Sequence, residues 1–209
     1  MKKFTFLFAI LLGMVFSSVA QPKIGVRAGY NLTRVAKLAD LDDYEYGRAG
    51  FDWKSAANFG VTIDLRKSER FVFRPGIYFS MKGFKDNGSM MPVTNLNYLE
   101  MPLLAVFQIS LGEKTRLEFQ IGPYVAYGVC GKYKFESCVV KKNDSFESVY
   151  TKFPSFKDGD FKRFDLGGNA GLGVNYEHYY LGASYELGTT FIMTDAPNHC
   201  ISVNLGYIF

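Results

Sequence analysis

Eight segments of the chain alternate between apolar residues and polar or small residues with a period of two. This period is typical of β-strands, because successive side chains of a strand point to opposite faces. The final segment shows it most clearly, with Ile201, Val203, Leu205, Tyr207 and Phe209 at the apolar positions. The eight predicted strands span residues 23–33, 58–66, 70–82, 96–109, 116–130, 163–176, 179–189 and 201–209.

The connections between these segments alternate between long and short. The long ones span residues 34–57, 83–95, 131–162 and 190–198, and the short ones span residues 67–69, 110–115 and 177–178. Outer-membrane barrels combine short periplasmic turns with longer extracellular loops and an even number of strands. We therefore predict an all-β protein that folds as an eight-stranded antiparallel up-and-down transmembrane β-barrel. A soluble lipocalin-like barrel is disfavoured, because Phe71, Phe73 and Phe79 share a face too apolar for water.

The N-terminus has the features of a cleaved secretory signal peptide. Met1-Lys2-Lys3 is basic, residues 4–16 are uncharged and mostly apolar, and residues 17–20 (SSVA) are suitable for cleavage. We assign residues 1–20 to the signal peptide and residues 21–209 to one barrel domain, located in the outer membrane. Without Lys2 and Lys3 the formal net charge falls from +4 to +2, which does not indicate a nucleic-acid partner.

The face opposite the apolar one carries charged residues of both signs. A charge inside a low-dielectric barrel is tolerated only when it is paired or hydrated, so this near balance predicts a network of ion pairs. Eight strands enclose an interior that side chains can fill, so we expect no open pore. The predicted lumen charges are Arg27, Asp64, Arg66, Arg74, Lys82, Glu100, Arg116, Glu118, Arg163, Asp165 and Glu186.

Glu100 is expected to be a structural ion-pair partner inside the barrel. It lies on the fourth predicted strand, beside a third strand that turns Arg74 inward. We predict that Glu100 pairs with Arg74 or with Arg116. A proton-titrating role for Glu100 is the alternative, and it is disfavoured because interior ion pairs commonly serve structure.

The sequence offers no motif for catalysis, and we expect that the protein is not an enzyme. His199 lies near Asp195, close to what a surface lipid hydrolase would need, but no nucleophile motif accompanies it and Ser202 is three residues away. No metal and no other cofactor is predicted, since the acidic residues of the first long connection lack the spacing of a calcium loop. These residues are Asp40, Asp42, Asp43 and Glu45.

Three cysteines in an exported protein leave at least one unpaired. Cys130 and Cys138 bracket a short segment at the base of the longest connection, so a disulfide between them is feasible in an oxidising envelope. Cys200 is a competing partner at the same rim. Fully reduced cysteines are the other alternative, because the sequence does not fix disulfide geometry.

Aromatic residues are concentrated in the two longest connections. Some are expected to form girdles at the membrane surface or to extend strands beyond it. The others are candidates for binding an extracellular or envelope partner, because loops on a rigid scaffold commonly carry function. The candidate binding residues are Tyr44, Tyr46, Trp53, Tyr133, Phe135, Phe146 and Tyr150.

Four motifs stand out along the predicted strands. They are residues 97–104 (NYLEMPLL), residues 122–124 (GPY), residues 164–174 (FDLG leading to GLGV) and residues 205–209 (LGYIF). Together they resemble the PorT-like outer-membrane β-barrel family of Bacteroidetes, over essentially the whole mature chain. The resemblance implies a small integral barrel without a shared catalytic residue. The family's founding members are accessories of a cell-surface secretion system, a role that similarity of fold does not transfer.

The C-terminal strand resembles the last strand of bacterial outer-membrane barrels, which the barrel-assembly machinery recognises by its terminal aromatic residues. Tyr207 and Phe209 would supply this signal here. The expected partners are therefore outer-membrane lipid, the assembly machinery and an unidentified extracellular or envelope component. We expect a non-enzymatic scaffold whose loops bind that component, with secretion or envelope assembly as candidate processes. A narrow solute channel is the main alternative, and a surface lipid hydrolase is a lesser one.

Overall fold

The computed structural model describes residues 22–35, 51–66, 68, 70–86, 93–140, 146–157, 161–190, 192 and 197–209, without side chains at 51, 86, 135–140 and 146–150. Outside these residues lie the predicted signal peptide, the acidic residues of the first long connection, Tyr44 and Tyr46. The strands are β1 (Lys23–Val35), β2 (Phe51–Asp52), β3 (Lys54–Arg66), β4 (Phe71–Asp86), β5 (Val93–Ser110), β6 (Thr115–Cys130), β7 (Lys132–Val140), β8 (Phe146–Pro154), β9 (Phe164–Tyr176), β10 (Tyr179–Gly188) and β11 (Asn198–Ile208). No helix in this part of the chain is long and apolar enough to cross a membrane.

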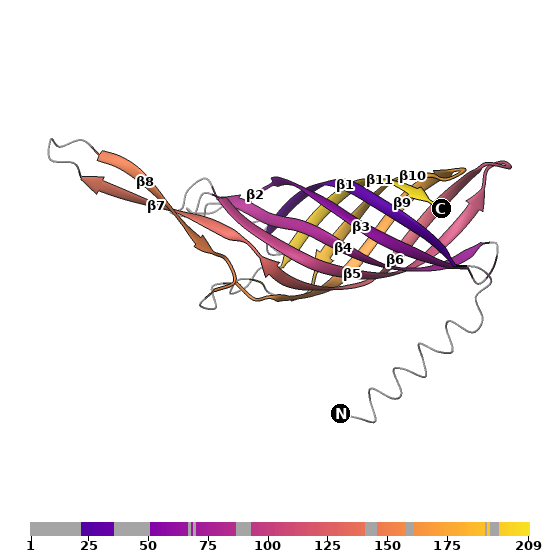
Figure 1. Cartoon of the computed structure of the whole chain (residues 1–209), viewed down its shortest axis with the longest axis horizontal. Helices are drawn as coiled ribbons and strands as arrows, with labels where there is room; N and C mark the ends of the chain where they lie inside the picture. The colour runs from indigo at the N-terminus through magenta and orange to yellow at the C-terminus, as the bar shows by residue number, and fades with distance from the viewer. Residues whose placement is uncertain are drawn as a thin grey trace, which may run out of the picture.

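Eight of the strands close into an antiparallel barrel (Figure 1). They follow one another around the ring in the order β1, β3, β4, β5, β6, β9, β10 and β11. The ring closes between the first and last strands, where Val26 of β1 is the register partner of Tyr207 of β11. The predicted eight-stranded up-and-down barrel is confirmed.

Several barrel strands are longer than the alternation predicted, among them the neighbours β4 and β5. β4 continues to Asp86 and β5 begins at Val93, and Phe84 pairs with Thr94 across this extension. Gly83 permits the close approach of the two strands: its φ is +133°, and a Cβ there would lie 2.1 Å from the Thr94 carbonyl oxygen. The pairing continues beyond the apolar pattern because backbone hydrogen bonds do not require apolar side chains.

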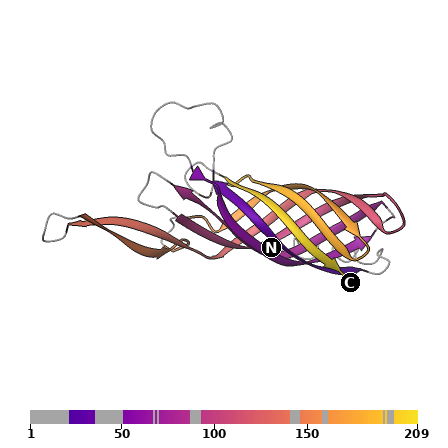
Figure 2. The same ribbon diagram turned by 90° about the horizontal axis from the view of Figure 1, so that it is seen from above.

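Strands β7 and β8 form a hairpin that projects from one end of the barrel (Figures 1 and 2). Both strands lie inside residues 131–162, the longest of the predicted connections. The base of the hairpin is joined by a hydrogen bond of 3.0 Å from the Ser155 N–H to the Gly131 carbonyl. We name this end of the barrel the hairpin end. The opposite end is the turn end, where short connections join β3 to β4, β5 to β6, and β9 to β10.

The outer surface of the barrel is an apolar belt. Ile121, Leu172 and Leu205 are 66, 54 and 64% exposed, and large apolar side chains are exposed on all eight barrel strands. A continuous apolar surface of this kind fits lipid and is unsuited to water. The polar residues of the same strands point inward, which is the reverse of a lipocalin-like barrel and excludes that alternative.

Candidate functional site

The lumen contains three groups of buried charges, which follow one another from the turn end to the hairpin end. In the first group, Arg74 of β4 is completely buried and contacts Asp64 of β3 and Glu118 of β6. The Arg74 Nη2 lies 2.7 Å from Asp64 Oδ2, and its Nη1 lies 2.7 Å from Glu118 Oε2. Because β5 separates β4 from β6, this single guanidinium connects strands across the lumen.

The second group is centred on Lys82 of β4, which is also completely buried. Its Nζ lies 2.7 Å from Glu100 Oε2 and 2.9 Å from Glu186 Oε2. Asn169 of β9 donates a hydrogen bond of 3.0 Å to Glu186. One ammonium thus serves two carboxylates, which come from β5 and β10 on different sides of the barrel.

The predicted pairing of Glu100 with Arg74 or Arg116 is wrong. Tyr78 is the register partner of Glu100 on the neighbouring strand, and Arg74 and Lys82 lie on either side of Tyr78 along β4. Arg74 is already engaged by Asp64 and Glu118, so Lys82 is the cation that reaches Glu100.

The third group is nearest the hairpin end and contains a single carboxylate, that of Asp165. It accepts hydrogen bonds from Tyr124 Oη at 3.2 Å, Thr190 Oγ1 at 2.8 Å and Asn198 Nδ2 at 2.9 Å. These three donors stabilise the buried charge in the absence of a direct cation contact among the described residues. The inward-facing Tyr124 links this group to the second, because Lys82 Nζ lies 4.5 Å from the centre of its ring.

Four predicted lumen charges, Arg27, Arg66, Arg116 and Arg163, lie outside these groups. Arg163 is exposed at the hairpin end, where it donates to the carbonyls of Gly128 at 3.0 Å and Phe156 at 2.9 Å, so its prediction as a buried lumen charge is wrong. It immediately precedes β9, so its position is not fixed by the alternation of that strand. Arg66 and Arg116 are partly exposed near the turn end.

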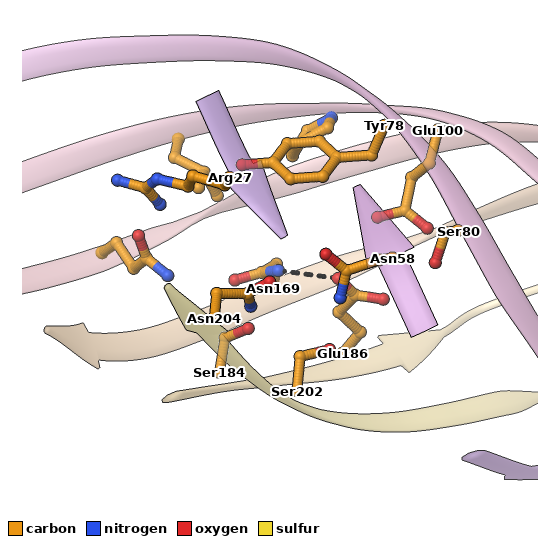
Figure 3. A pocket seen from close by; sticks show the side chains of 13 residues that line it. Arg27, Asn58, Tyr78, Ser80, Glu100, Asn169, Ser184, Glu186, Ser202 and Asn204 are labelled. Atoms are coloured by element: carbon orange, nitrogen blue, oxygen red, sulfur yellow. Dashed lines mark hydrogen bonds between the residues drawn. The ribbon is translucent and has the colours of Figure 1, made fainter. Parts of the chain in front are cut away.

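A small polar cavity of about 30 Å³ lies in the middle of the lumen, lined in part by Arg27, Asn58, Glu100, Asn169 and Glu186 (Figure 3). The guanidinium of Arg27 stacks on the ring of Tyr180, 3.6 Å from its centre. A cavity of this size accommodates about two water molecules, each of which needs at least 10–15 Å³.

An apolar cluster closes the lumen at the hairpin end. Phe156 and Phe161, which follow the hairpin in sequence, are buried there. Phe156 packs edge-on against Tyr98, with ring centres 5.7 Å apart, and Phe161 lies 6.2 Å from Phe84. Gly128 makes room for Phe156, since a Cβ at that position would lie 2.4 Å from its ring. The full cluster consists of Val35, Phe84, Leu96, Tyr98, Tyr124, Ala126, Phe156, Phe161 and Ile192.

The base of the hairpin has one aromatic and one basic face. Tyr133 stacks on its register partner Phe153 at 5.6 Å and contacts Phe161 of the apolar cluster at 6.0 Å. Lys134 and Lys152 are register partners, and both side chains are exposed. This basic pair could not be predicted from the alternation of residues, because only the register of the hairpin places the two lysines opposite each other.

The other predicted binding residues are not gathered into one site. Trp53 is partly buried next to β3, and the Arg34 guanidinium lies 4.8 Å from its ring centre. Phe135 lies on β7, and Phe146 and Tyr150 lie on β8, but their side chains are outside the described part of the structure. Of the predicted set, Tyr133 alone is thus placed with its side chain on the hairpin.

Of the alternatives that the sequence left open, a disulfide between Cys130 and Cys138 does not form, because Cys130 has a free, exposed thiol. Cys130 ends β6, whereas Cys138 lies well along the extended β7. At about 3.3 Å per residue, Cys138 lies roughly 20 Å along β7 from Lys132, the residue at which the strand begins. A disulfide requires Cα atoms within about 7 Å of each other. Cys200 is also free and is buried beside Ser202.

The structure separates the two residues that a hydrolase would have to bring together. Ser202 points into the lumen, where it donates to Asn31 at 2.8 Å. His199 lies beside Tyr185, which belongs to the outer belt, at 2.6 Å from its hydroxyl. In the part of the chain that the structure describes, no group of three or more His, Cys, Asp or Glu residues could hold a metal ion.

The chain matches one family of membrane barrels and is similar in fold to solved structures of such barrels. Residues 19–191 match a family described as "Outer membrane protein beta-barrel domain". Ail, the attachment invasion locus protein of Yersinia pestis, has a similar fold, with a TM-score of 0.47, 18% identity and coverage of 91% of this chain and 100% of Ail. OprG of Pseudomonas aeruginosa has a TM-score of 0.46, 12% identity and coverage of 91% and 97%. Among curated proteins, no sequence matches the chain.

Proposed function

Because the chain belongs to the family of outer membrane protein β-barrel domains, we propose that it is a closed membrane anchor whose projecting hairpin binds a component of the cell surface. The barrel lies in the outer membrane, with its apolar belt in contact with lipid. Short turns mark the periplasmic side of such barrels and long connections the extracellular side. In this orientation the hairpin end faces the cell exterior.

The observation that carries this proposal is the occupied lumen. Buried ion pairs at Arg74 and Lys82 and the apolar cluster around Phe156 leave a central cavity of only about 30 Å³. A closed barrel of this kind offers no path for a solute and no interior site for a ligand of ordinary size. The surface available for binding is then that of the loops, and the hairpin is the largest described element among them.

The construction of the hairpin also supports a binding role. It is anchored to the barrel through the Ser155–Gly131 hydrogen bond and through Tyr133, which packs on the buried Phe161. A rigid base limits the entropy lost on binding, which favours affinity. A role without catalysis is proposed because Ser202 and His199 lie on opposite faces of β11.

Two measurements test this proposal. In planar lipid bilayers we expect the purified protein to give no stable, selective conductance steps, and such steps would instead support the solute-channel alternative. In living cells, a photo-crosslinking residue at exposed Thr151 of the hairpin should form adducts with a surface component, whereas one at exposed Lys114 of the turn end should not. Equal labelling from both positions, or none from Thr151, would contradict a binding role for the hairpin.

Excision of the hairpin provides the matching loss-of-function variant. The hydrogen bond between Gly131 and Ser155 holds the two ends of the hairpin together, so a two-residue turn can replace residues 132–154. We expect this variant to fold, as judged by faster gel migration without boiling, and to lose the adducts. Phe156 must be retained, because it belongs to the barrel's apolar cluster.

We also propose that the chain is a PorT-like member of its family and that the assembly machinery recognises its last strand. The position of the NYLEMPLL motif supports membership of the PorT-like group. Its Tyr98 belongs to the apolar cluster, and its Glu100 belongs to the group centred on Lys82. The exposed positions of Tyr207 and Phe209 at the end of the closing strand support recognition by the assembly machinery. A role in secretion would be tested by deleting the gene and measuring protein release from the cells.

A further inference from the structure

The base of the hairpin carries three exposed lysines, Lys132, Lys134 and Lys152, on one face. We propose that these lysines bind the phosphate groups of the glycolipid that surrounds the barrel in the outer leaflet. This inference rests on the proposed binding role of the hairpin and names the chemistry of its partner.

The register of the hairpin places two of these positive charges directly opposite each other. Lys134 of β7 is the partner of Lys152 of β8. In an antiparallel pair, opposite residues have Cβ atoms about 4.5–5.5 Å apart, and like charges at such positions destabilise the pairing. An anion bound between the two ammonium groups would remove this repulsion, so the arrangement is better suited to a bound state than to an empty one.

The lysine face points away from the barrel axis. On the opposite face, Tyr133 pairs with the fully buried Thr94 of β5 and contacts Phe161 in the apolar cluster. Alternate residues of a strand point to opposite sides, so Lys132 and Lys134 are on the side of the surrounding membrane. The Lys132 backbone is held in this position, because its carbonyl accepts a hydrogen bond of 3.1 Å from the Asn95 side chain.

Lys132, the lysine nearest the barrel, lies at the height of lipid head groups. Val129 is the last exposed apolar residue of β6, and Lys132 follows three residues later. At about 3.3 Å per residue, Lys132 lies roughly 10 Å and Lys134 roughly 17 Å along the strand from Val129. Strand tilt reduces these heights by about a quarter, and head groups extend about 5–8 Å beyond the hydrocarbon on each side. The basic face thus begins near the lipid phosphates and extends above them.

Neighbouring residues reinforce the positive charge. Lys157 and Lys162 are exposed beside the hairpin base, and every charged side chain described in residues 131–134, 151–157 and 161–163 is basic. Lysine ammonium groups are common phosphate ligands, because each presents a compact charge and three hydrogen-bond donors. A lipid phosphate in the adjacent leaflet therefore has the charge that complements these lysines, and it lies near the start of the lysine face and on the side to which that face points.

The test uses the full mature protein in detergent and measures binding of diphosphorylated lipid A by native mass spectrometry. The reference ligand is the same acylated disaccharide without phosphates. We expect the phosphorylated form to bind about tenfold more tightly, since each basic residue near an anionic surface contributes substantially to binding. Equal affinity for the two ligands would overturn the proposal.

The discriminating variant is Lys152→Glu. It removes one phosphate ligand and places an opposite charge across from Lys134, so we expect weaker lipid A binding by about tenfold with unchanged or raised thermal stability. Lys114→Glu at the turn end is the matched control and should bind normally. If Lys152→Glu fails to fold, the triple variant K132Q/K134Q/K152Q serves the same purpose. Unchanged binding in the folded variants would overturn the proposal.

A soluble polyanion is distinguished from lipid in the same assay. If inorganic polyphosphate bound the protein and displaced lipid A at equal phosphate concentration, the commitment to a lipid ligand would be wrong. If neither phosphate ligand bound but Thr151 still formed adducts in cells, this inference would fail and the proposed binding role of the hairpin would stand.

Discussion

Lys82 and Glu100 form a buried ion pair of 2.7 Å between neighbouring strands of the barrel, and the same lysine reaches Glu186 at 2.9 Å on the far side of the lumen. The contact couples β4, β5 and β10 through one ammonium group. A charge so deeply buried is stable only while its counter-charge is present, so the members of this group are not equivalent in their importance.

Replacement of Lys82 by Met should destabilise the barrel strongly. It would leave the carboxylates of Glu100 and Glu186 buried without their shared cation, at an expected cost of about 3–5 kcal/mol. Glu100→Gln should cost much less, because Lys82 keeps Glu186 as its partner. The free energy of unfolding in detergent, measured by denaturant titration, compares the two. Equal losses in both variants would show that Lys82 is not the centre of the group.

Phe156→Ala should loosen the closure of the lumen at the hairpin end. Phe156 is 8% exposed and packs on Tyr98, so its truncation should cost about 3 kcal/mol. Phe153→Ala is the matched control, because Phe153 is 41% exposed on the hairpin and should change stability by less than about 1 kcal/mol. Thermal unfolding monitored by gel mobility measures both variants. A larger effect of Phe153→Ala would contradict the assignment of Phe156 to the closing cluster.

Gly122→Ala should be destabilising although it adds a single methyl group. A Cβ at Gly122 would lie 2.1 Å from the Leu103 carbonyl oxygen of the neighbouring strand, so the backbone would have to shift. We expect a loss of about 1–3 kcal/mol. Gly168→Ala meets no atom within 4 Å and should be neutral within about 0.5 kcal/mol. Denaturant titration of the two variants in parallel tests this contrast, and similar midpoints would show that the strands can separate freely at Gly122.

Phe209→Ala should impair assembly in cells more than it impairs stability. Phe209 is 66% exposed, so its side chain contributes little packing within the folded barrel. If the assembly machinery recognises this terminal aromatic, the amount of folded protein in the outer membrane should fall. Leu205→Ala, at a position 64% exposed on the same strand, is the control and should assemble normally. Quantitative blotting of membrane fractions measures the outcome, and equal levels of both variants would argue against the proposed recognition.

The number of barrel strands, their order and the face to which most residues point can all be predicted from the amino-acid sequence. These properties follow from the local chain, because a period of two assigns each side chain to one face and the alternation of long and short connections sets the topology. Arg27, Asp64, Arg74, Glu118 and Asp165 are accordingly found in the lumen, where the alternation placed them.

Which of these residues contact one another depends on the closed barrel. Lys82 rather than Arg74 pairs with Glu100, because Arg74 is held by Asp64 and Glu118 in a separate group. The burial of Phe156 and Phe161 in the barrel mouth and the opposition of Lys134 to Lys152 depend likewise on the return path of the chain and on the register of the hairpin. A local pattern assigns a side chain to a face, but its partners on that face are fixed only when all the strands are closed into one barrel.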